Sequence, residues 1–288
     1  MAHAHGEYYL PQPSYWPIIG TIAIFTTLSS FAAYLNGVEI GGYGMIGGIA
    51  LLLFMMFGWF RVVINESESG LYNEQVDRSF RWGMIWFIFS EVFFFAGFFG
   101  ALLYTRVFSL PWLLGEGDKG AAHTLLWPEF TENWPSNGPA GIGGDFESME
   151  AWGIPALNTL ILLTSGATVT WAHWALKADN RRNLILGLFL TFSLGLTFVG
   201  CQAYEYSHAY THMNLTLGSG VYGSVFFMLT GFHGFHVTVG SIMLITIFLR
   251  SIRGHFTPKH HFAFEAVAWY WHFVDIVWLG LFIFVYWI

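Results

Sequence analysis

The chain has 288 residues, of which 55% are hydrophobic and 20% aromatic, whereas only 10% are charged. Soluble domains carry about a quarter charged residues. This composition, with a mean hydropathy of +0.53, therefore predicts an integral membrane protein and excludes an ordinary soluble domain. The net charge of −7, without any basic run, argues against nucleic-acid binding. The single cysteine, Cys201, excludes an intramolecular disulfide, and the N-terminal segment lacks a signal-peptide pattern.

Seven segments are long and apolar enough to cross a membrane, which takes roughly 20 apolar residues. They must be helices, because lipid offers no partner for open backbone groups. The sequence thus predicts an all-α membrane protein with spans at 16–34, 42–60, 83–108, 154–176, 184–204, 220–249 and 266–288.

Basic residues gather in the loops that follow the second, fourth and sixth spans. By the positive-inside rule these loops and the N-terminus face the cytoplasm, or the matrix in a mitochondrion, and the C-terminus lies outside. The loops hold nine of the eleven basic residues: Arg61, Arg78, Arg81, Lys177, Arg181, Arg182, Arg250, Arg253 and Lys259.

The one long connection, at 109–153, lies on the predicted outer side and is acidic. Its Gly, Pro and Trp content favours an ordered surface cover. A docking surface for a basic partner is the alternative.

The third span carries a carboxylate, Glu91, inside a run of phenylalanines. It lies about 12 Å into the membrane at about 1.5 Å per residue, close to the midplane. An ionised side chain there is costly. Glu91 is therefore either a proton-exchanging or lipid-contacting group, or a neutral, hydrogen-bonded structural acid.

Four more polar residues lie near the middle of the last two spans. His233 and His236 share a helical face in "GFHGFHV", and His272 and Asp275 do so in "WYWHFVDIVW". A metal or haem site is one hypothesis. We favour a buried polar cluster that holds helices together, and we expect no metal, because a metal site needs more converging ligands.

Two further histidine groups raise the hypothesis of a histidine-box oxygenase. Glu205, His208 and His212 end the fifth span, and a second group lies in the last inner loop. The predicted topology places the two groups on opposite membrane faces, about 30 Å apart, so they cannot share a metal. The second group is His255, His260 and His261.

With these segments assembled, the chain resembles the subunit III family of cytochrome c oxidase. The motifs that carry the resemblance run from the first span to the last. They are "PSYWPIIG" at 13–20, "SEVFFFAGFF" at 90–99, "NTLILLTSGATVTWAH" at 158–173, "GVYGSVFF" with "GFHGFHV", and "HFTPKHHFAFEAVAWYWHFVDIVWL" at 255–279. Seven spans, not five, favour the cytochrome c-using branch over the quinol oxidases.

The resemblance implies a subunit without catalytic residues in a complex that oxidises cytochrome c, reduces dioxygen to water and pumps protons. Haem and copper are expected in the partner subunits I and II, and phospholipid on this chain. The expected role is to sustain proton uptake into subunit I, bind lipid and stabilise the complex. An independent proton-coupled transporter is the alternative from another class of protein.

The resemblance also implies two helix bundles, at 1–64 and 65–288, with a V-shaped, lipid-binding cleft between them. Glu91 is then the carbodiimide-reactive carboxylate that lines this cleft. Basic and acidic groups at the inner interface are expected to contact lipid head groups: Arg61, Glu66, Arg250, Arg253 and His255.

Two expectations concern the compartment. The outer loop is longer than in mitochondrial members, which favours a bacterial cytoplasmic membrane. His3, His5 and Glu7 lie on the predicted inner side, where protons are taken up. Because histidines titrate near neutral pH, these residues are candidates for a proton-collecting antenna, with a disordered tail as the alternative.

Overall fold

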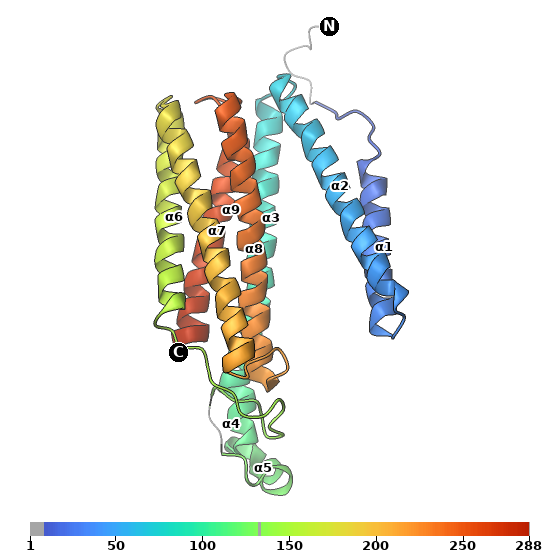
Figure 1. The fold of residues 1–288 in the computed structure, drawn as a ribbon, viewed down its shortest axis with the longest axis vertical. Helices are drawn as coiled ribbons and strands as arrows, with labels where there is room; N and C mark the ends of the chain where they lie inside the picture. The colour runs from blue at the N-terminus through green and yellow to red at the C-terminus, as the bar shows by residue number, and fades with distance from the viewer. Residues whose placement is uncertain (1–8, 132–133, 288) are drawn as a thin grey trace. The chain divides into compact units, whose positions relative to one another are not determined.

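The computed structural model describes residues 9–131 and 134–287, and regular structure in this part of the chain is entirely helical (Figure 1). Seven stretches reach membrane-spanning length, which confirms the predicted spans. The third comprises α3 with its continuation to Leu113, and the seventh comprises α9 with η3. The elements are α1 (Trp16–Leu35), α2 (Ile40–Glu68), α3 (Glu74–Tyr104), η1 (Thr105–Ser109), α4 (Leu110–Leu113), η2 (Gly117–Lys119), α5 (Gly120–Leu126), α6 (Ile154–Lys177), α7 (Arg181–His212), α8 (Gly220–Arg253), α9 (Phe262–Leu281) and η3 (Phe282–Trp287).

Several helices extend beyond the apolar run that predicted them, as α2 does by continuing to Glu68. Hydropathy marks the part of a helix inside hydrocarbon, whereas the helix itself ends where its backbone groups find caps. The Asn180 side chain accepts a hydrogen bond from Asn183 N (3.1 Å) at the start of α7. Gly254, with φ of 79°, ends α8 in the left-handed region that favours glycine.

The chain divides into two compact units, Met1–Trp82 and Gly83–Ile288. The division falls inside α3, later than the predicted boundary after residue 64, because the start of α3 packs with the end of α2. The Tyr72 ring lies 5.0 Å from the Phe80 ring, and its hydroxyl donates to Glu66 Oε2 (2.8 Å). Burial and the Glu66 carboxylate raise the pKa of the Tyr72 hydroxyl, so it remains a donor at neutral pH. The lipid cleft between the bundles stays a prediction.

The first unit is built on a close hairpin of α1 and α2, drawn in blue in Figure 1. Glycines on α2 let the two backbones approach each other. A Cβ on Gly41 would lie 2.6 Å from Ser30 O, and one on Gly48 would lie 2.7 Å from Thr27 N. Neighbouring Gly47 faces open space, with nothing within 4 Å of such a Cβ.

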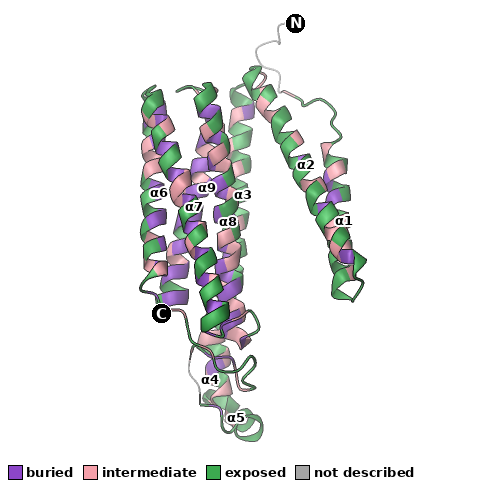
Figure 2. Ribbon diagram, in the orientation of Figure 1, coloured by how far each residue is buried: buried purple, intermediate pink, exposed green. Residues whose placement is uncertain are grey.

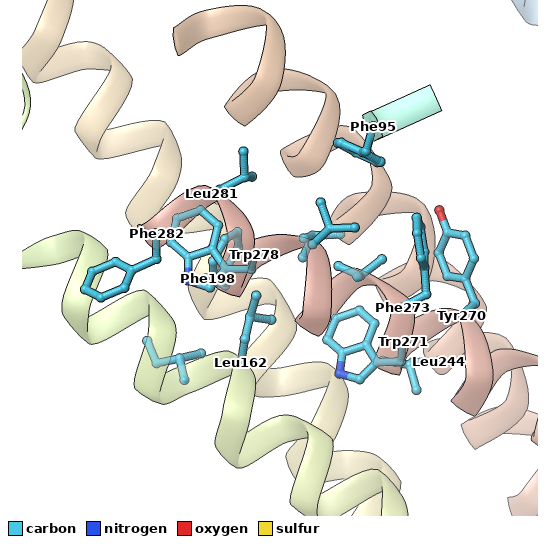
Figure 3. Packing of buried hydrophobic residues seen from close by; sticks show 14 of the residues in the cluster. Phe95, Leu162, Phe198, Leu244, Tyr270, Trp271, Phe273, Trp278, Leu281 and Phe282 are labelled. Carbon is cyan, nitrogen blue, oxygen red and sulfur yellow. The ribbon is translucent and has the colours of Figure 1, made fainter. Parts of the chain in front are cut away.

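The second unit has one continuous core in which α6 packs on α7, α7 on α8, and α9 on both α6 and α8. Figure 2 shows buried residues on the inward faces of these helices, and Figure 3 shows their large aromatic side chains interleaved. The indoles of Trp271 and Trp278 are almost fully buried, and each N–H finds a hydroxyl on α6, Ser165 Oγ and Thr159 Oγ1 (2.9 Å each). Buried indoles need such partners.

Helix α3 joins this core through long aromatic side chains. Phe95 is 2% exposed, and the Phe94 ring meets the Phe232 ring edge-on at 5.0 Å. The phenylalanine run is therefore partly a packing surface for α8, which narrows the directions in which Glu91 can point.

The acidic connection after α4 packs against the segment that joins α7 to α8 and against the first turn of α8. Phe146 stacks on Tyr222 with centroids 5.4 Å apart. The Asn214 side-chain amide donates to Gly143 O (3.1 Å) and Asp145 O (2.8 Å). These contacts give the loop a defined conformation over the end of the second unit.

Replacing Gly48 with alanine is expected to destabilise the hairpin by about 1–3 kcal/mol, the usual cost of overpacking, because Thr27 backbone atoms cannot yield. Thermal unfolding of the purified protein in mild detergent measures this as a lower midpoint. Gly47→Ala is the matched control and should be neutral or slightly stabilising, since alanine favours a helix. Equal midpoints for the two variants would contradict the close approach at Gly48.

Candidate functional site

The intramembrane carboxylate Glu91 lies on α3 opposite α8, where it meets His236. Glu91 Oε2 is 2.9 Å from His236 Nε2, and the two side chains are 22% and 10% exposed. The interaction joins residues 145 positions apart in the chain. Glu91 therefore has a hydrogen-bonding partner within its own chain.

The hydrogen bond of the other ring nitrogen of His236 determines where the protons of the Glu91–His236 pair lie. Nδ1 lies 2.6 Å from Phe232 O, and a carbonyl can only accept, so Nδ1 carries a proton. The remaining proton lies between Nε2 and the carboxylate. Either a neutral acid donates to a neutral imidazole, or an imidazolium donates to a carboxylate. Both arrangements have zero net charge, which lowers the cost of placing the pair in the membrane.

Aromatic rings surround the imidazole. The Phe95 ring meets it edge-on at 5.0 Å, and the Tyr270 ring is stacked at 6.4 Å. The Tyr270 hydroxyl also donates to His236 O at 3.4 Å. An apolar surrounding strengthens the hydrogen bond and makes its loss costly.

His233 has a different partner, although it is only one helical turn from His236. It is fully buried, and its Nε2 donates to Val274 O on α9 (3.1 Å). Its ring lies between Phe198 and Trp278. This histidine links α8 to α9.

His272 and Asp275 form a third group on the face shared by α6 and α9. His272 Nδ1 lies 3.7 Å from Asp275 Oδ2, and its Nε2 lies 3.2 Å from Thr170 Oγ1. The His272 side chain is 42% exposed and lines an open groove of about 660 Å³. Gly166 allows the approach, since a Cβ there would lie 2.5 Å from Asp275 Oδ2.

The predicted cluster of His233, His236, His272 and Asp275 is therefore three separate sites, and His272 is not buried within this chain. Residues three apart on a helix differ in direction by about 60°. That difference directs His236 to α3 and His233 to α9. The polar residues of α9 itself lie toward α6.

The predicted lipid-contacting residues divide between the two units. Arg61 and Glu66 end the second span in the first unit, where Arg61 is exposed. Arg250 and Arg253 lie in the last turn of α8 in the second unit, and His255 follows the helix. Arg250 is almost buried, with its guanidinium 4.7 Å from the Phe256 ring centroid. The antenna residues His3, His5 and Glu7 lie outside the described residues.

Sequence reasoning missed one polar group. His173 near the end of α6 lies beside His261 and Glu265 at the start of α9. The spacing of His261 and Glu265, four apart on one helix, was a visible signal. The sequence carries no such signal for His173, because it lies 88 positions before His261 and only the packing of α6 against α9 brings the two together.

Comparison with known proteins gives a consistent result along the whole chain. The family model described as cytochrome c oxidase subunit III matches residues 5–117 and 122–288. The chain belongs to this family.

Its relatives named cytochrome c oxidase subunit 3 include proteins from animals and plants. That of Equus caballus is 41% identical over 290 residues, covering 100% of this chain and 99% of the relative. That of Marchantia polymorpha is 42% identical over 283 residues, covering 97% and 96%. That of Latimeria chalumnae is 42% identical over 290 residues, covering 100% and 99%.

Family membership establishes a multi-pass membrane subunit of an oxidoreductase complex. The groups described above are thus those of a subunit III. Inside the membrane these polar groups connect its helices in pairs.

Replacing Glu91 with alanine is expected to lower stability by about 1–3 kcal/mol, because His236 Nε2 then has no partner in an apolar pocket. Glu91→Gln should cost less, since its amide N–H can donate to Nε2. The rank order of unfolding midpoints in detergent measures this.

Ser90→Ala is the control for that series, since the Ser90 hydroxyl bonds to Phe87 O on its own helix (2.7 Å). Its midpoint should match the parent. Equal losses in the alanine and glutamine variants at position 91 would show that the hydrogen bond to His236 does not stabilise the protein.

Proposed function

We propose that this chain is the non-redox subunit III of a proton-pumping, aerobic respiratory cytochrome c oxidase. The observation that carries the proposal is the family match, which extends over nearly the whole chain. In this proposal haem and copper are bound by subunits I and II, and cytochrome c is the electron donor of the complex.

The geometry of the intramembrane histidines supports a non-redox role. Both ring nitrogens of His236 are engaged, one by Glu91 and one by Phe232 O, and His233 donates to a backbone carbonyl. Axial haem ligands need a ring nitrogen directed into a large cavity. These imidazoles instead connect helices.

The lateral groove at His272 supports contact with a partner subunit. A half-exposed imidazole and an adjacent carboxylate inside the membrane are costly against lipid, and such groups usually face protein. The groove is lined by α6 and α9. We assign this face to the contact with subunit I, the main partner, with subunit II as a further neighbour.

Phospholipid binding is proposed at the basic helix ends and beside Glu91. Arg61, about two turns before the end of α2, and Arg253, the last residue of α8, are exposed, and guanidinium groups there can pair with lipid phosphates. Glu66, Arg250 and His255 complete the proposed inner-interface set. Lipid held there is proposed to stabilise the complex and sustain proton uptake into subunit I.

We place the chain in a bacterial cytoplasmic membrane, with the N-terminus inside and the C-terminus outside. The basic connections after α2, α6 and α8 support this orientation. His3, His5 and Glu7 are then on the side of proton uptake, where an antenna role stays a proposal.

An independent proton-coupled transporter is the second candidate. It would use Glu91 and Asp275 as its relay, but these carboxylates belong to separate polar groups, one with His236 and one with His272. A subunit III of a quinol oxidase is the closer alternative. The electron donor of the complex, quinol or cytochrome c, distinguishes it from the proposal.

Purification through a tag on this chain in mild detergent is expected to recover haem bands in the reduced-minus-oxidised spectrum, together with cytochrome c oxidation. The separated chain should be colourless. Quinol oxidation without cytochrome c oxidation would support the quinol-oxidase alternative. A colourless chain that elutes alone would contradict the proposal and favour the transporter.

Glu91→Ala is expected to shorten the catalytic lifetime of the complex, measured as activity lost per turnover, while the initial rate stays close to the parent. The reason is that a loosened α3–α8 contact perturbs lipid beside the subunit. Glu91→Gln should show a smaller effect. Normal kinetics with reduced assembly would instead indicate a purely structural role.

A further inference from the structure

The end of α6 and the start of α9 bring three ligand-type side chains together in the second unit. Within residues 9–131 and 134–287, His173, His261 and Glu265 form the one group of this kind whose ligand atoms all lie within 4.8 Å of one another. His173 lies on the last turns of α6, His261 directly precedes α9, and Glu265 is in its first turn. Figure 1 shows α6 and α9 as neighbours in this unit.

The spacing of these atoms suits a tetrahedral ion. Glu265 Oε1 lies 3.2 Å from His261 Nε2 and 3.6 Å from His173 Nε2. Ligands at about 2.0–2.1 Å from zinc in a tetrahedron are about 3.3 Å apart. Two of the separations are therefore within a few tenths of an ångström of those in a zinc site.

A backbone contact sets the tautomer of His261. Its Nδ1 lies 3.0 Å from Thr257 O, and a carbonyl can only accept, so Nδ1 carries the proton. In the neutral ring Nε2 then presents a lone pair toward Glu265. A backbone carbonyl on the other nitrogen is the arrangement that orients metal-bound histidines.

The two histidines of the group each have a buried ring nitrogen without a hydrogen bond. The Nε2 atoms of His173 and His261 are both buried and have no hydrogen-bond partner, and the His261 side chain is only 8% exposed. A cation beside the Glu265 carboxylate would satisfy these two nitrogens.

We propose that His173, His261 and Glu265 bind a zinc ion, with water at the fourth position. Two imidazoles favour zinc over magnesium or calcium, which prefer oxygen ligands. Lys177, one turn further along α6, is exposed, so solvent screens its charge. The ion connects the end of α6 to the start of α9. The proposal concerns this chain's own residues and is independent of the electron donor of the complex.

Zinc binding to the intact complex tests this. The complex is treated with chelator, desalted and titrated with Zn²⁺ in competition with a fluorescent indicator, and bound zinc is counted by mass spectrometry. The parent should hold one more equivalent than His173→Gln, His261→Gln or Glu265→Gln, or bind it at least about tenfold more tightly. His260→Gln is the matched control, because His260 adjoins His261 but is exposed and outside the group.

X-ray absorption at the zinc edge on the zinc-loaded parent complex gives a second readout that needs no variant to fold. The expected first shell is two imidazole nitrogens and two oxygens at about 2.0–2.2 Å. A first shell without imidazole, together with equal zinc content in all variants, overturns the proposal and leaves a proton as the cation of the group.

Discussion

Lipid provides no hydrogen-bond partners, and this constraint determines how the polar side chains of the membrane-spanning helices are arranged. Glu91 is paired with His236, His233 with a carbonyl of α9, and the two core indoles with hydroxyls of α6. Each of these bonds joins two helices. The polar residues therefore fix which helix faces meet.

The constraint also separates the polar groups from one another. A pair with one shared proton, such as Glu91 with His236, needs no further polar neighbour, and aromatic rings can close around it. A continuous relay across the membrane would need polar groups in contact along its length. The separate pairs are better suited to holding helices together than to relaying protons across the membrane.

The ends of the helices follow a different rule, because water and lipid head groups are within reach there. Arginines remain exposed within about two turns of the ends of α2 and α8, and Asn180 and Gly254 provide caps. The group of His173, His261 and Glu265 is the exception, since two of its ring nitrogens are buried without a hydrogen bond although it lies near helix ends. Buried nitrogens without a hydrogen bond beside a carboxylate are what suggest an ion.

The sequence by itself determined the seven spans, the helical class and the family, because hydropathy and motif order are local properties of the chain. It also identified Glu91 as a residue in need of a partner. It did not identify that partner, and it grouped His233, His236, His272 and Asp275 as one cluster. Only the tertiary structure decided that Glu91 meets His236 and that His173 meets Glu265. These contacts depend on the rotation of each helix about its axis, which the packing of side chains from distant segments sets and which no local pattern encodes.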